Sequence, residues 1–260
     1  MQDLQSSIAA ELGVASHFDV TSEVARRIAF VVEYSRTARA NTLVLGISGG
    51  VDSTVAGRLC QLAVEDLRAS GQPTRFIAMR LPYGTQADQA DADRALAFIG
   101  PDQVLTVDIQ PAADAMLRQL KAAGLSFRDA AQEDFVLGNI KARQRMVAQY
   151  AVAGTTSGLV VGTDHAGEAV TGFFTKYGDG GFDLTPLGGL TKGRVRAIAT
   201  ALGAAPSLAQ KVPTADLETL RPLRPDEAAL GVSYEHIDDF LEGRPVPAAA
   251  ARTIVETYRR

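Results

Sequence analysis

The chain has 260 residues, of which 26 are basic and 30 acidic, so its formal net charge is −4, and it contains a single cysteine. This length suits one compact domain, the interspersed charges do not indicate a nucleic-acid-binding surface, and one cysteine excludes an internal disulfide framework. No apolar run approaches the roughly 20 residues of a membrane span, and the N-terminus lacks the apolar core of a secretory signal. We therefore expect a cytoplasmic protein of one domain, residues 1–260, with no nucleic-acid or membrane partner.

The first half of the chain alternates between helical and strand patterns. Apolar residues at helical spacing predict helices over residues 21–39, 53–69, about 90–99, 114–123 and 135–153. Short β-branched and apolar runs predict strands over residues 42–47, 75–81, 103–109 and 157–163. This alternation predicts an α/β fold, a doubly wound parallel sheet with helices on both faces. Ligands in such folds bind outside the carboxyl ends of the strands.

Two stretches lack a regular pattern. Residues 175–189 are rich in glycine, and residues 204–225 contain several prolines. Each stretch is long enough for a binding loop or a lid.

A glycine-rich turn, GISGGVDS (residues 46–53), lies where the first predicted strand becomes a helix. Its last two glycines let the backbone approach a ligand, its serines offer hydroxyl donors, and the following helix adds a positive dipole end. These features predict a phosphate or pyrophosphate site. The turn is not a Walker loop, because no lysine follows the glycines. Asp52 would repel a phosphate unless a hard cation such as Mg²⁺ lies between them.

The string SGGVDS resembles the pyrophosphate loop of the ATP pyrophosphatase group, whose members cleave ATP between the α and β phosphates and leave an adenylate on the substrate. Five further blocks narrow the resemblance: RLPYGTQAD, GNIKARQRMVAQY, GTDHAGEAVTGFFTKYGDGGFDLTPL, KVPTADL and LGVSYEHIDDFLEG. Together, over about residues 20–258, the chain resembles the ammonia-dependent NAD synthetases. The resemblance implies an adenine nucleotide alpha hydrolase-like fold.

The reaction that this resemblance implies has two steps. Deamido-NAD attacks the α phosphorus of ATP, giving an adenylated nicotinate carboxylate and pyrophosphate, and ammonia then displaces AMP to form NAD. The resemblance implies ATP as co-substrate, Mg²⁺ as cofactor, and a homodimer with deamido-NAD bound at the interface. Phe135 and Arg143 would then act across subunits. The apolar positions of their predicted helix suit either a core or an interface.

The same resemblance implies the site residues. ATP would contact Gly46, Ile47, Ser48, Gly49, Gly50, Val51, Asp52, Ser53, Arg80, Gln86, Thr163, Lys192 and Thr214. Deamido-NAD would contact Tyr34, Phe135, Arg143, Phe173, Lys176 and Asp183, with the two phenylalanines suited to stacking on the cationic pyridine ring. Asp52 and Glu168 would hold Mg²⁺, and Asp179 would bind ammonium and take up its proton. An Asp52→Ala change is expected to abolish adenylation and leave the fold intact.

Several alternatives stay open at this level. His165 is one histidine without a second ligand at suitable spacing, so we interpret it as structural, and Cys60 as a core residue. The residues of a glutaminase are absent, which favours free ammonia, although a separate glutaminase subunit is compatible with one sequence. Rival functions are another adenylating enzyme and a non-catalytic nucleotide sensor; the presence of both Asp52 and Glu168 favours catalysis. The family's His-Lys pair beyond Tyr258 has no counterpart before Arg260, so those contacts are unassigned.

Overall fold

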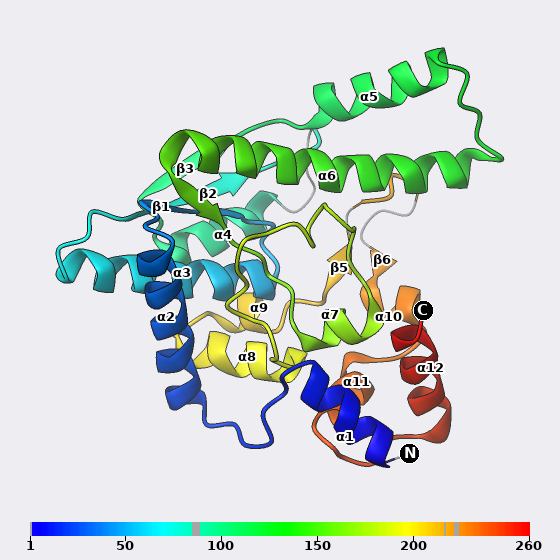
Figure 1. Ribbon diagram of the computed structural model, residues 1–260. Helices are drawn as coiled ribbons and strands as arrows, with labels where there is room; N and C mark the ends of the chain where they lie inside the picture. Colours follow the sequence, from blue (N-terminus) through cyan, green and yellow to red (C-terminus); the bar gives the residue numbers. More distant parts are fainter. Residues whose placement is uncertain (1, 85–88, 216, 221–223) are drawn as a thin grey trace.

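The computed structural model describes residues 2–84, 89–215, 217–220 and 224–260. A four-stranded parallel sheet with the order β3-β2-β1-β4 forms its centre (Figure 1). The strands are β1 (Thr42–Gly46), β2 (Arg75–Arg80), β3 (Gln103–Thr106) and β4 (Gly158–Val160). The chain builds outward from β1 to β3 and then crosses back to place β4 on the other side of β1. The predicted α/β fold and its four strands are confirmed.

Alternate side chains of the strands build a core on each face of the sheet. Leu43 and Leu45 of β1 and Phe76 of β2 belong to the larger core, which also buries Cys60, as predicted. The helices of this layer are α2 (Val20–Thr37), α3 (Val51–Ala69), α4 (Gln89–Ile99), α8 (Lys192–Ala201) and α9 (Pro206–Ala209). Helix α3 packs against α2, α4, α8 and α9 and so lies at the centre of the layer.

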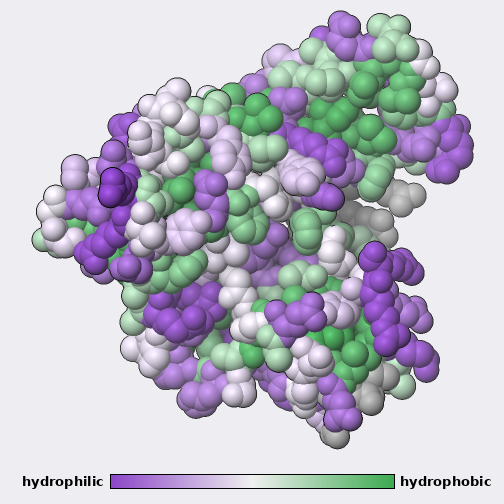
Figure 2. Space-filling model, in the orientation of Figure 1, coloured by the Kyte–Doolittle hydropathy of each residue, from purple (hydrophilic) through white to green (hydrophobic). Residues whose placement is uncertain are grey.

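The opposite face is covered by α6 (Ala130–Thr156), which packs on β1 and β4 and carries α5 (Gln110–Ala122) on its outer side. Val44 of β1 and Ile77 of β2 point to this face. Figure 1 shows α5 and the first half of α6 extending beyond the sheet as an arm. Hydrophobic residues gather on the surface of this arm (Figure 2), among them Met116, Leu125 and Phe135, which are 46%, 47% and 58% exposed.

A third group of helices packs around its own apolar cluster, which includes Ile8, Ile237 and Phe240. Its members are α1 (Gln2–Glu11), α7 (Ala166–Thr171), α10 (Asp226–Leu230), α11 (Tyr234–Leu241) and α12 (Ala248–Tyr258). The two ends of the chain meet here, because the Tyr258 hydroxyl donates to Glu11 Oε2 at 2.5 Å. The sequence patterns predicted none of these five helices.

The two stretches without a sequence pattern are mostly loop. Residues 172–191 contain one isolated bridge, between Val161 and Leu184, and no helix or strand. The second stretch holds α9 and an antiparallel pair of two-residue strands, β5 (Thr214–Ala215) and β6 (Arg224–Pro225). Within the described ranges, no helix is long and apolar enough to cross a membrane.

Candidate functional site

A cavity of about 610 Å³ lies at the carboxyl ends of β1, β2 and β4, where a doubly wound sheet binds its ligands. Its wall is formed by the glycine-rich turn, the segment after β4, one side of α6, and residues 211–213 and 217–218. Twelve of the predicted site residues line it: Gly46, Ile47, Ser48, Gly50, Val51, Asp52, Ser53, Phe135, Thr163, Glu168, Phe173 and Asp179.

The glycine-rich turn is held by hydrogen bonds before any ligand binds. The Gly46 N–H donates to Gln149 Oε1 of α6 at 2.8 Å, which ties the end of β1 to the opposite layer. The Gly50 N–H donates to the Ser48 hydroxyl at 3.2 Å, and the Ser53 hydroxyl lies 3.1 Å from that of Ser48. Because α3 begins directly after Gly50, the turn places an anion at a helix N-terminus.

Gly49 of this turn faces α4 and not the cavity. Its φ of +81° is a left-handed conformation, and a Cβ there would lie 2.6 Å from the Ala92 nitrogen and 3.0 Å from Asp91 Cβ. Only glycine satisfies both constraints. Helix α4 therefore packs directly on the predicted phosphate turn.

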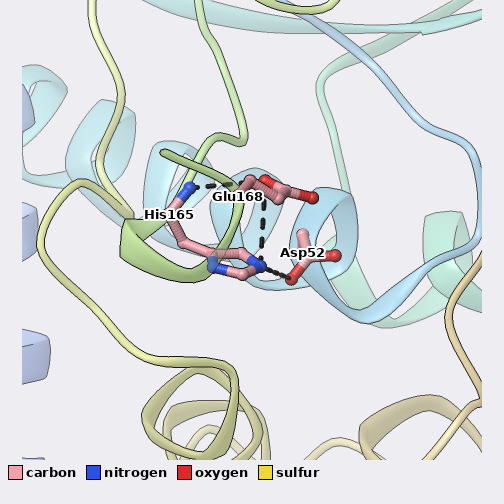
Figure 3. A group of neighbouring side chains, drawn as sticks. All are labelled: Asp52, His165 and Glu168. Atoms are coloured by element: carbon pink, nitrogen blue, oxygen red, sulfur yellow. Dashed lines mark hydrogen bonds and ion pairs between the residues drawn. The ribbon is translucent and has the colours of Figure 1, made fainter. Parts of the chain in front are cut away.

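Asp52, His165 and Glu168 form a cluster beside the cavity (Figure 3), and Lys192 pairs with its Asp52 carboxylate. Lys192 Nζ lies 2.7 Å from Asp52 Oδ2, and Lys192 is 1% exposed. His165 Nε2 lies 3.7 Å from both Asp52 Oδ1 and Glu168 Oε2. Asp52 Oδ1 is buried and has no hydrogen-bond partner among the described residues. An ionised, buried oxygen without a partner is typical of a site that binds a cation.

The protonation of these groups follows from burial and charge. Burial and the neighbouring Asp52 raise the pKa of Glu168 well above its usual value. Burial also raises the pKa of Asp52, but Lys192 and the other groups around the carboxylate together outweigh burial, so the net effect lowers the pKa. Burial lowers the pKa of Lys192, and Asp52 and Glu168 more than reverse that change. Lys192 is thus a fixed charge that keeps Asp52 ionised.

His165 separates the two carboxylates and is not itself suited to ligate a metal. Burial and the Lys192 charge lower the pKa of its ring to about 3, so the ring is neutral. Its Nδ1 accepts the Gly167 N–H at 3.1 Å and caps α7, which assigns the ring proton to Nε2. That N–H faces Asp52 and Glu168, and no lone pair is left for a metal.

The acidic groups fit a magnesium ion. Mg²⁺ binds carboxylate oxygens in preference to nitrogen, and the Asp52 and Glu168 oxygens lie within 4.8 Å of each other and of the His165 nitrogen. A divalent cation would satisfy the unpartnered Asp52 Oδ1 and remove the charge repulsion between the two acids.

A second acidic pair lies nearby. Asp179 Oδ1 accepts the Thr175 N–H at 2.8 Å, and burial raises the pKa of its carboxyl above the usual value. Burial, with the charges of Asp179 and Asp52, raises the pKa of Asp164 to about 7. Asp164 is thus able to hold a proton near neutral pH. Sequence analysis singled out Asp179 and missed Asp164, because its shift arises from three-dimensional neighbours.

Comparison with known proteins identifies the family. The family model described as NAD synthase matches residues 23–256. The chain is 65% identical over 252 residues to an NH3-dependent NAD+ synthetase of Burkholderia mallei (strain SAVP1), covering 97% of this chain and 89% of the relative.

The chain belongs to the NAD synthase family.

Solved structures agree with this membership. An NAD+ synthetase from Burkholderia pseudomallei superposes with a TM-score of 0.88 at 62% identity, covering 99% of this chain and 94% of that one. An NMN synthetase from Francisella tularensis superposes with a TM-score of 0.79 at 31% identity, covering 94% of each chain.

The residues predicted for the dinucleotide fall into three places in this NAD synthase fold. Phe135 and Phe173 line the cavity. Outside it, the Arg143 Nε–H donates to the Lys176 carbonyl at 3.1 Å, which joins these two basic residues. A third group is built around Asp183, whose carbonyl accepts the Tyr34 hydroxyl at 3.0 Å.

Asp183 also anchors the loop that carries it. Its Oδ1 accepts the Tyr150 hydroxyl at 3.1 Å, and its Oδ2 accepts the Val160 N–H of β4 at 2.7 Å. Burial and the charge of Asp183 raise the pKa of Tyr150 to about 12, so the tyrosine stays a donor. Sequence analysis did not identify Tyr150 as a contact of Asp183.

Besides Gly49, four residues predicted for ATP lie outside the cavity wall or outside the described residues. Arg80 ends β2 and pairs with Asp93 at 3.0 Å. Lys192 lies behind Asp52, under the Tyr234 ring, whose centroid is 4.8 Å from its Nζ. Thr214 begins β5, and only its backbone is described; Gln86 lies outside the described residues.

Seven unpredicted polar residues also line the cavity: Asn139, Arg145, Gln149, Thr175, Lys211, Glu218 and Asp226. Asn139, Arg145 and Gln149 lie on α6. The lining residues of this helix include Gly138, Ala142, Arg145 and Gln149, which follow one another at spacings of four and three and therefore share one helix face. That spacing was readable in the block GNIKARQRMVAQY, and the block KVPTADL contains Lys211.

Proposed function

We propose that this chain catalyses the ATP-dependent amidation of deamido-NAD to NAD with ammonia, through an adenylated intermediate, releasing AMP and pyrophosphate. The observation that carries the proposal is the buried, unpartnered Asp52 Oδ1 beside the phosphate turn, with Glu168 and a fixed lysine charge around it. The full-length similarity to NH3-dependent NAD+ synthetases supports the choice of substrates.

In the first step, a carboxylate oxygen of the nicotinate attacks the α phosphorus of ATP, and the bond from that phosphorus to the β-phosphate oxygen breaks. The turn formed by Gly46, Ile47, Ser48, Gly49, Gly50, Val51, Asp52 and Ser53 would hold the phosphates, with Arg80, Gln86, Thr163, Lys192 and Thr214 as further ATP contacts. Mg²⁺, held by Asp52 and Glu168, would neutralise the phosphate charge and stabilise the departing pyrophosphate. Lys192 keeps Asp52 ionised for that role.

In the second step, ammonia attacks the acyl carbon and AMP leaves with the oxygen it received from the nicotinate. Ammonium must lose a proton before its nitrogen can attack. Asp179 is proposed as the group that binds ammonium and accepts this proton, because its carboxyl lines the cavity and burial raises its pKa. Catalysis otherwise depends on holding the two substrates in contact.

The dinucleotide would extend from the cavity over the surface of α6. Phe135 and Phe173 are proposed to stack on the pyridine ring. The proposed polar contacts are Arg143, Lys176, Asp183 and Tyr34, which the fold places in two groups beside α6.

We also propose a homodimer in which α5 and α6 form the interface. Phe135 and Val147 of α6 are 58% and 52% exposed, and Met116 of α5 adds to the same apolar surface. Phe135 and Arg143 would then contact dinucleotide bound by the partner. Sedimentation is expected to give a dimer, and Val147→Glu to give a monomer; a monomeric wild type would contradict this part.

The proposal takes residues 1–260 as one NAD synthetase domain, which the family match to residues 23–256 supports. A cytoplasmic location suits a chain with one cysteine, because reducing compartments keep thiols free.

The test is a product assay with purified protein, ATP, Mg²⁺, deamido-NAD and ammonium chloride. Equal amounts of NAD, AMP and pyrophosphate are expected. Parallel reactions replace ammonium with glutamine, and deamido-NAD with nicotinate mononucleotide, because the Francisella tularensis relative is an NMN synthetase. Turnover of the mononucleotide alone would change the proposed substrate, and ATP binding without pyrophosphate release would favour a nucleotide sensor.

A further inference from the structure

The two cations proposed above to contact ATP already have carboxylate partners. Lys192 pairs with Asp52, and Arg80 pairs with Asp93 outside the cavity wall. Asp52 and Glu168 add negative charge to the same place. ATP with one bound Mg²⁺ still carries roughly two negative charges, so the site needs a further positive group.

Two cationic side chains line the cavity among the described residues, Arg145 and Lys211. The Arg145 Nε–H donates to the Leu81 carbonyl at 3.0 Å, and the charge of this arginine acts on Asp179. Arg145 therefore belongs to the side of the cavity assigned to ammonia. Lys211 remains as the candidate for the phosphate side.

One side chain, that of Asp91, lies between Lys211 and the phosphate turn. Its Nζ is 2.7 Å from Asp91 Oδ2 in α4. Asp91 Cβ in turn lies 3.0 Å from the position that a Cβ of Gly49 would occupy. The lysine ammonium is thus separated from the turn by the length of one aspartate, a distance within reach of a flexible four-carbon stem.

The ion pair between Lys211 and Asp91 is able to open without leaving a buried charge unpaired. Arg94 binds the other oxygen of Asp91, so the carboxylate keeps a partner when Lys211 leaves. The side chains of Lys211 and Asp91 are 20% and 24% exposed, and partly solvated ion pairs contribute little stability. A polyphosphate offers the ammonium more negative charge than Asp91 does.

We propose that Lys211 is a phosphate-binding residue, which exchanges Asp91 for the β and γ phosphates of ATP and then for the pyrophosphate product. This inference rests on the proposed function for the identity of the nucleotide. The inference assigns to a lysine outside the turn the role that a lysine within the loop plays in Walker sites. Asp91 holds the ammonium near the turn until the nucleotide arrives.

The test compares the binding of three probes, MgATP, magnesium pyrophosphate and AMP, by calorimetry. Lys211→Met keeps the aliphatic stem and removes the charge. We expect this change to weaken the binding of ATP and of pyrophosphate by about tenfold to a hundredfold. The binding of AMP should weaken by less than about twofold, because AMP lacks the β and γ phosphates. Lys121→Met, which breaks an ion pair with Glu133 on α5 and α6, controls for the loss of one positive charge. Lys211→Gln replaces Lys211→Met if the latter unfolds.

The variant Asp91→Asn distinguishes phosphate binding by Lys211 from a role of the ion pair in closing the cavity. If Lys211 binds phosphate, removing the competing carboxylate should increase the affinity for ATP by about twofold to fivefold. If the ion pair only closes the cavity, Asp91→Asn and Lys211→Met should each weaken the binding of ATP, pyrophosphate and AMP to a similar extent. That result, or unchanged ATP binding by Lys211→Met, would overturn the inference. Failure of the proposed function would appear separately, as wild-type protein that binds ATP but forms no NAD.

Discussion

Lys192 reaches Asp52 from behind the phosphate turn, with its Nζ 2.7 Å from Oδ2 and 140 residues between them in the chain. The lysine begins α8, and Asp238 holds that helix end by accepting the Lys192 N–H at 2.9 Å and the Gly193 N–H at 2.6 Å. The ion pair therefore joins the phosphate turn to a helix of a different part of the fold, and it couples the proposed magnesium site to the stability of the protein.

This relationship changes the expectation for Asp52→Ala. The sequence suggested that this change leaves the fold intact, but in the structure it leaves a lysine that is 1% exposed without its partner carboxylate. Breaking a buried pair from one side costs about 3–5 kcal/mol. We expect Asp52→Ala to lower the free energy of unfolding by that order, measured by urea unfolding without Mg²⁺, and to abolish pyrophosphate release.

The double variant Asp52→Ala/Lys192→Met separates the two effects. Removing both charges should restore much of the stability, because no unpaired ion remains, and should not restore activity. A double variant as unstable as Asp52→Ala would contradict the paired arrangement.

Gly49 and Gly50 are expected to respond differently to alanine. At Gly49 the φ of +81° and the 2.6 Å approach of the Ala92 nitrogen both oppose a side chain. The left-handed conformation alone costs about 1–3 kcal/mol. A Cβ at Gly50 meets only the Ser48 hydroxyl, at 3.4 Å. Thermal unfolding should show a large loss for Gly49→Ala and a small one for Gly50→Ala; equal losses would show that α4 does not constrain the turn.

Tyr150→Phe tests the support of Asp183. The change removes the hydrogen bond to Asp183 Oδ1 and leaves the one from Val160 to Oδ2. We expect KM for deamido-NAD to rise by about twofold to tenfold, with KM for ATP unchanged. Tyr34→Phe, which removes the bond to the Asp183 carbonyl, is the matched comparison. A fall in kcat with both KM values unchanged would argue against a positioning role.

Asp164 should make stability depend on pH, because its pKa is raised to about 7 by burial and by the charges of Asp179 and Asp52. Between about pH 4 and pH 7 the unfolded carboxyl is ionised while the folded one keeps its proton. The contribution of Asp164 to the free energy of unfolding is thus largest at low pH. It declines through this window by at most about 1.4 kcal/mol per pH unit, and above the window it stays constant.

The neutral variant Asp164→Asn lacks this decline. Its stability relative to wild type should increase from pH 4 to pH 7 and then level off, in urea unfolding without Mg²⁺. Asp66→Asn, at an exposed position of α3, controls for the loss of one acid. A difference between Asp164→Asn and wild type that does not change with pH would contradict the raised pKa.

The parts of the fold that the sequence predicted are those with a regular pattern over many residues. The four strands and helices α2 to α6 have such patterns, and their predicted bounds agree with the structure within a few residues. Helix α7 has only six residues and α10 only five, too short for a period to be read. Helices α1, α11 and α12 pack on one another and on α7 and α8, so tertiary contacts define them.

The candidate site was predictable where its functional residues are neighbours in the sequence. The turn at residues 46–53 stood out because its glycines, serines and acid lie together between a strand and a helix. The partners that hold it, Gln149 and Lys192, come from α6 and α8, and no local pattern relates them to it. The raised pKa of Asp164 likewise depends on neighbours from other segments.

The central claim is that the nicotinate carboxylate becomes adenylated, and an isotope measurement tests it most directly. Deamido-NAD labelled with ¹⁸O in both carboxylate oxygens is converted with ATP, Mg²⁺ and ammonium, and the products are analysed by mass spectrometry. Because the attacking oxygen stays on phosphorus when ammonia displaces AMP, we expect one labelled oxygen in AMP and none in pyrophosphate. Unlabelled AMP, or ADP formed with labelled orthophosphate, would contradict the account.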